Sequence, residues 1–92
     1  GNTLARFGLA NTLRTKGKLP KAVDQYNKVL ELDAGHKPAR NNLADTLLRL
    51  GRCDTALSVL QPVLNKAVSE SEIDKAINTT LAEIQETCPE TQ

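Results

Sequence analysis

The sequence contains few of the residues from which small proteins build an aromatic core or a reactive site. Trp and Met are absent, Phe and Tyr occur once each, and aromatic residues make up 2% of the 92-residue chain. The core is therefore expected to be aliphatic, built from Leu, Val, Ile and Ala. The single histidine, His36, provides no catalytic triad, and the glycines form no phosphate-binding loop. The scattered acidic residues indicate solvated helix surfaces, so we expect no catalytic residue, no metal site and no cofactor.

Charge and hydropathy exclude further classes of partner. The chain has 12 basic and 11 acidic residues and a net charge of +1, which is too little for a nucleic-acid or anionic-membrane surface. No apolar run approaches the roughly 18 residues of a membrane span, and no signal peptide is evident. The chain starts with Gly1 rather than Met and enters a helical pattern at once. We expect it to be an excised fragment of a longer protein, with a glycine left from a tag.

A period of 34 residues is the main feature that the sequence does contain. When the chain is shifted by 34 residues, 11 of 34 positions match, where chance gives roughly two. A period of this length indicates a stack of helical repeats, and it fixes the whole fold. The matching residues of the first copy are Gly1, Ala5, Arg6, Leu9, Ala10, Thr12, Leu13, Gly17, Ala22, Val29 and Leu30.

Each copy predicts two helices, because its apolar residues recur at spacings of three and four. In the first copy a helix near 3–16 ends at Gly17, since glycine adopts the left-handed conformation that terminates helices. A second helix near 20–32 opens with Pro20, which suits a first helical turn.

The second copy repeats this pattern with a proline near its end. It predicts a helix over 38–50 that is followed by Gly51. A second helix is predicted to begin with Asp54 as its N-cap and to run to about Asn65. Pro62 lies inside this last helix and predicts a kink.

Small residues recur where two helices of a pair must cross closely. These are Ala10, Ala22, Ala44 and Ala56. We expect the most buried residues to be Leu43, Leu47, Ala56 and Leu60. A last helix, over about 70–87, begins with a capping box formed by Ser69 and Glu72. Its outer face is polar, so it is expected to cap the stack.

The residues at these phases resemble the tetratricopeptide repeat family. In the first copy they are Arg6, Leu9, Ala10, Leu13, Ala22, Tyr26 and Ala34, and in the second Arg40, Leu43, Ala44, Leu47, Ala56, Leu60 and Val68. The resemblance implies an all-α, right-handed superhelical stack of five helices in one domain. Its parts would be repeat one at about 3–36, repeat two at about 37–68 and the capping helix at about 70–87.

The resemblance also bears on the two cysteines. Cys53 follows the first helix of the second copy, and Cys88 ends the capping helix. In this family the two helices run side by side in the same direction, which brings both cysteines to one rim. A disulfide would imply a periplasmic or secretory compartment. Two unrelated thiols are the alternative, and they leave a cytoplasmic location open.

Members of this family bind protein segments in a concave groove that the first helices line, so the resemblance implies a protein-interaction module with a protein or peptide partner. One subgroup clamps the C-terminal carboxylate of chaperones, but here Phe7, Glu72 and Ala76 stand in place of its cations. The groove residues that the repeat phase implies are Phe7, Asn11, Arg14, Asn41, Asn42, Asp45, Leu48, Arg49, Lys75 and Thr79.

A different function fits the same pattern. We expect no residue ahead of Leu4 in this sequence to cover the outer side of the first helix. In this alternative the domain is an assembly element. It would stack on further repeats, or it would self-associate through its N-terminal helix pair. In either role it would be no enzyme itself, and at most the non-catalytic arm of one.

Overall fold

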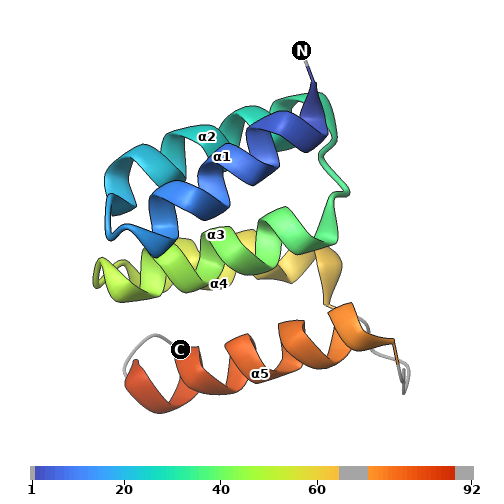
Figure 1. The fold of residues 1–92 in the computed structure, drawn as a ribbon. Coiled ribbons are helices and arrows are strands. Elements are labelled where there is room, and N and C mark those ends of the chain that lie inside the picture. Colours follow the sequence, from blue (N-terminus) through green and yellow to red (C-terminus); the bar gives the residue numbers. More distant parts are fainter. Residues whose placement is uncertain (1, 65–70, 89–92) are drawn as a thin grey trace.

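The computed structural model describes residues 2–64 and 71–88, and this part of the chain is helical throughout apart from its turns. Figure 1 shows three layers, with α1 beside α2, then α3 beside α4, and α5 last. The predicted all-α stack of helix pairs is confirmed, while its handedness stays a prediction. The elements are α1 (Thr3–Thr15), α2 (Leu19–Leu32), α3 (Lys37–Arg49), α4 (Cys53–Leu60), the short 3₁₀ helix η1 (Gln61–Val63) and α5 (Glu72–Thr87).

Glycines end the first helix of each copy, as predicted. Gly17 and Gly51 have φ angles of 79° and 78°, in the left-handed region that only glycine adopts at low cost. The chain can then turn back, and the amide of Lys18 donates to the carbonyl oxygen of Leu13 at 2.9 Å. Pro20 lies in the first turn of α2, where its missing N–H leaves no hydrogen bond unmade.

The core lies where the two helices of each pair meet and where one pair packs on the next. The four alanines predicted at close crossings are all fully buried. Leu43, Leu47 and Leu60 are also buried, which confirms the core predicted from the repeat phase. Because the side chains at these crossings are so small, the helix axes can approach closely.

The helix predicted over 54–65 differs from the observed one at both ends. It begins at Cys53 with Arg52 as the N-cap, and Asp54 lies in its first turn. The α-helix ends at Leu60, so Pro62 does not kink it but lies in η1. Proline lacks the N–H for the bond to the residue four positions earlier, and its ring crowds that carbonyl group, so the tighter 3₁₀ turn replaces the α-helix. Asn65 lies outside the described residues.

The last helix, α5, starts two residues later than the predicted boundary of 70. Its N-cap is Ser71, whose Oγ accepts a hydrogen bond from the backbone N–H of Asp74 at 3.2 Å. The predicted cap Ser69 lies outside the described residues. Ile77 and Ile84 are buried, and α5 packs against both α3 and α4.

Candidate interaction face

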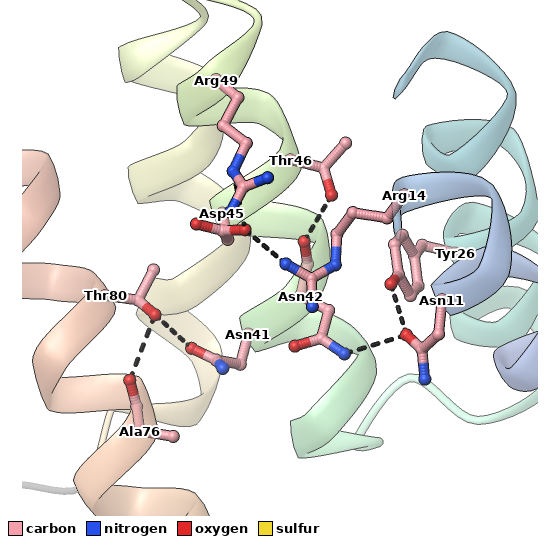
Figure 2. Close-up of polar contacts among 10 residues, drawn as sticks. All are labelled: Asn11, Arg14, Tyr26, Asn41, Asn42, Asp45, Thr46, Arg49, Ala76 and Thr80. Atoms are coloured by element: carbon pink, nitrogen blue, oxygen red, sulfur yellow. Dashed lines mark hydrogen bonds and ion pairs between the residues drawn. The ribbon is translucent and has the colours of Figure 1, made fainter. Parts of the chain in front are cut away.

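The polar side chains predicted to line a groove lie on the side of the stack where α1, α3 and α5 follow one another. Figure 2 shows that several point toward each other across the gaps between these helices. We call α1, α3 and α5 together the first-helix face. Hydrogen bonds and ion pairs join these side chains to one another and to Tyr26 of α2, and we call the set the inter-helix network. Its members are Asn11, Arg14, Tyr26, Asn41, Asn42, Asp45, Arg49 and Thr80.

Asn11 is the centre of the network between α1 and α3. Its Oδ1 accepts a hydrogen bond from Asn42 Nδ2 at 3.0 Å and a second one from the hydroxyl group of Tyr26. Tyr26 reaches this point from α2 and is completely buried. Burial raises the pKa of its hydroxyl above 10.0, and the Arg14 guanidinium offsets part of that rise. The hydroxyl therefore remains a neutral donor at physiological pH, and it fixes the orientation of the Asn11 amide.

Asp45 on α3 holds two arginines at once. Its Oδ2 lies 2.7 Å from Arg14 Nη1 on α1 and 3.3 Å from Arg49 Nε one helical turn further along α3. Side-chain exposure is 27% for Arg14, 18% for Asp45 and 57% for Arg49. Both arginines, which were predicted to line the groove, bind a carboxylate of the chain itself. An acidic partner would therefore have to compete with Asp45.

A second polar contact connects α3 to α5. The Thr80 hydroxyl lies 2.6 Å from Asn41 Oδ1 and 3.1 Å from the carbonyl oxygen of Ala76, so its single hydrogen can be donated to either. Sequence reasoning missed Thr80, which is buried. The repeat pattern could have identified Thr80, because Thr12, Thr46 and Thr80 are spaced by 34 residues.

Four of the predicted groove residues take no part in this network. Phe7 is half-buried, and its ring centroid lies 4.9 Å from that of His36 and 6.2 Å from that of Tyr26. Leu48 is half-buried against the core. Lys75 and Thr79 are exposed, and their polar contacts among the described residues stay within α5.

An ion pair between α3 and α5 has no counterpart in the sequence-based prediction. Lys37 Nζ lies 3.0 Å from Asp74 Oδ1, and Asp74 is only 5% exposed. The Ser71 hydroxyl donates to the other carboxylate oxygen at 2.8 Å. Since position 74 corresponds to Arg40 and Arg6 by the 34-residue period, the repeat pattern could not have identified it.

A disulfide bond between Cys53 and Cys88 connects α4 to α5. Cys53 is the first residue of α4 and Cys88 is the C-cap of α5, with their Cα atoms 6.1 Å apart. The bond joins the C-terminal end of α5 to the preceding helix pair. A disulfide of this kind is compatible with an oxidising compartment.

Comparison with known proteins supplies the family. A family model described as tetratricopeptide repeat matches residues 13–79. The chain belongs to the tetratricopeptide repeat family. No curated protein is significantly similar to this tetratricopeptide domain. Tetratricopeptide repeats generally mediate protein–protein interactions, so protein partners are the expected class.

Two further observations concern the described part of the domain alone. None of its helices is both long enough and apolar enough to cross a membrane. Within the same residues, His, Cys, Asp and Glu side chains nowhere gather in a group of three or more that could hold a metal ion.

Proposed function

We propose that the domain is a non-catalytic protein-interaction module that binds an extended or short helical segment of another protein along the first-helix face. The observation that carries this proposal is a pair of amides. Asn11 uses its Oδ1 and Asn42 uses its Nδ2 within the network. Figure 2 draws no hydrogen bond to Asn11 Nδ2 or Asn42 Oδ1 from the other residues that it shows. A neighbouring donor and acceptor of this kind match one peptide unit of a partner's backbone.

The neighbouring groups define what kind of segment would bind. Asp45 already neutralises the two arginines beside the amides, so the face favours recognition of a backbone over recognition of an acidic side chain. Half-buried Phe7 adds an apolar contact on α1. Such an interface relies on hydrogen bonds that the two asparagines are already oriented to make, which reduces the entropy lost on binding.

The test begins by selecting binding peptides from a displayed random library and measuring their affinity by calorimetry. Asn42→Ala is expected to weaken binding by roughly 5-fold or more, because a typical hydrogen bond contributes about 1 kcal/mol. Asn78→Ala, at an exposed position on α5, is the matched control and should bind normally. Peptides that bind Asn42→Ala as tightly as the wild type would exclude this site.

An assembly role is the second candidate, and the exposed leucines favour it. Leu4 is 76% exposed, Leu9 48% and Leu32 51%, and all three belong to the first helix pair. In this role the domain is one segment of a longer helical stack. Its test is whether an added helix pair raises the thermal stability of the domain, since repeat stacks gain stability from each interface between neighbours.

The disulfide bears on the compartment in which either function operates. Disulfides persist where the environment is oxidising and are rare where glutathione keeps thiols reduced. We therefore favour a periplasmic or secretory location over a cytoplasmic one. Alkylation of free thiols in extracts of the source cell, made without reductant, tests this: unmodified Cys53 and Cys88 are expected, and their alkylation would contradict it.

A further inference from the structure

Basic side chains gather at one end of the helix stack. The turns that join α1 to α2 and α3 to α4 lie at this end, as does the C-terminal end of α5 (Figure 1). The two turns and the starts of the helices that follow them carry four exposed cations, which we call the basic edge: Lys16, Lys18, Lys21 and Arg52. Lys18 and Arg52 are repeat equivalents, 34 positions apart. The edge therefore spans two successive layers of the stack.

Ion pairs within the domain do not account for these cations. In the described part of the chain, the basic residues that pair with a carboxylate are Arg14, Lys37, Arg49 and Lys75. None of them belongs to the basic edge. The nearest acidic residues in sequence, Asp24 and Asp54, are both exposed and form no ion pair with the edge. Its positive charge is therefore available to a partner.

Helix capping does not account for the cations either. The first helices α1, α3 and α5 each begin with a side chain that accepts a hydrogen bond from the first turn: Asn2, His36 and Ser71. The second helices α2 and α4 have Lys18 and Arg52 at the N-cap instead, and neither makes a side-chain capping hydrogen bond. A cation at a helix N-terminus is unfavourable, because the backbone dipoles make that end positive. A residue that breaks such a local rule is expected where function requires it.

We propose that the basic edge docks an acidic segment of a partner protein, at a second site that is independent of the segment proposed for the first-helix face. The carboxylates of this segment pair with Lys18 and Arg52 on adjacent turns. They also offset the repulsion between these two cations and the positive ends of α2 and α4. Because the edge is exposed, its contacts are charge pairs that salt screens.

The charges around the edge favour a narrow acidic segment over a larger polyanion. Glu86 is exposed near the C-terminal end of α5. The Cys53–Cys88 disulfide holds that end of α5 beside the start of α4. A membrane surface or a nucleic-acid duplex that lay across all three layers would therefore meet the carboxylate of Glu86, whereas a segment that follows only the two turns avoids it.

The test measures binding of a fluorescent oligo-glutamate peptide by anisotropy at low salt. Lys18→Gln/Arg52→Gln is expected to weaken binding by roughly 5-fold or more, because two charge pairs are lost. The variant should melt no lower than the wild type, since the cations it removes lie at helix N-termini. The matched control is Lys28→Glu, which changes the net charge by the same amount at an exposed position outside the edge. It should weaken binding by less than about 2-fold.

Other outcomes would overturn the proposal. Equal losses in the two variants would show that net charge, rather than the basic edge, governs binding, and a wild type that binds no oligo-glutamate would contradict the site outright. Asn42→Ala should bind oligo-glutamate normally, and a loss there would place the peptide on the first-helix face instead. Vesicles of phosphatidylcholine and phosphatidylserine in equal parts, and a short DNA duplex, are the remaining arms. Tighter binding of either one that depends on Lys18 and Arg52 would replace the acidic segment as the occupant.

Discussion

Removal of the Cys53–Cys88 disulfide is expected to lower the free energy of unfolding by about 4 kcal/mol. The bond joins residues 35 positions apart, and it therefore closes a long loop in the unfolded chain. The chain-entropy relation gives about 4 kcal/mol at 25 °C for a loop of that length. For a domain of this size, such a loss corresponds to a fall in melting temperature of roughly 15 to 30 °C. A stack of only two and a half repeats is expected to have low stability, so the fall in melting temperature should be easy to measure.

The loss should be uneven along the chain. The disulfide holds the C-terminal end of α5, whose other contacts are with α3 and α4. Without it, α5 keeps the burial of Ile77 and Ile84 but loses the covalent link between its C-terminal end and α4. Amide hydrogens of α5 are therefore expected to exchange faster by a larger factor than those of α1 and α2.

The assay is thermal unfolding followed by circular dichroism at 222 nm, with and without a phosphine reductant. The Cys53→Ser/Cys88→Ser double variant is the control, because it should melt at the reduced temperature under both conditions. Mass spectrometry after alkylation verifies that the starting protein is oxidised. If the oxidised wild type and the double variant melt within a few degrees of each other, the loop-entropy reasoning is refuted for this domain.

Three further perturbations test the core, the network and the ion pair. Ala56→Arg places a long charged side chain at a fully buried helix crossing and should abolish the folded state; a cooperative thermal transition in that variant would contradict the packing argument. Burial raises the pKa of Tyr26 above 10.0, so the folded domain keeps the phenolic proton at pH values where the unfolded chain releases it, and stability should fall as the pH rises above 10. Absorbance at 295 nm reports this tyrosine alone, and Tyr26→Phe should remove that part of the pH dependence. Lys37→Met takes one partner from the buried Asp74 and should cost about 1–3 kcal/mol in chemical denaturation, whereas Lys75→Met, which breaks an exposed pair with Glu72, should cost about 0.5 kcal/mol or less.

The 34-residue period predicts the stack well because the residues that repeat are the ones that form the core. Alanine recurs at each close crossing, and leucine recurs where one pair packs on the next. The same packing geometry in successive layers requires the same side-chain volume at the same phase. The order of the helices and the burial of the alanines at the close crossings follow from this requirement.

The polar pairs between helices could not be predicted in this way, because at least one residue of each pair does not repeat. Arg14 binds Asp45 across the gap between α1 and α3, yet the repeat equivalents of these residues are Leu48 and Asn11. Each gap between layers therefore has its own polar pairs, which depend on side-chain positions that only the folded structure supplies. The end of α4 was mispredicted for a similar reason, since Pro62 permits both a kinked α-helix and a 3₁₀ turn.

The network also determines how a partner's affinity should respond to salt. A segment that binds Asn11 and Asn42 through its backbone leaves the ion pair between Arg14 and Asp45 intact, because the amide groups it uses are separate from those charges. A segment that binds through carboxylates must first displace Asp45, and it would leave that half-buried carboxylate without one of its cations. Screening by salt weakens charge pairs but has little effect on hydrogen bonds between neutral amides. Affinity for a selected peptide should therefore change little as sodium chloride is raised, and a steep loss of affinity would show that the arginines, rather than the asparagines, hold the partner.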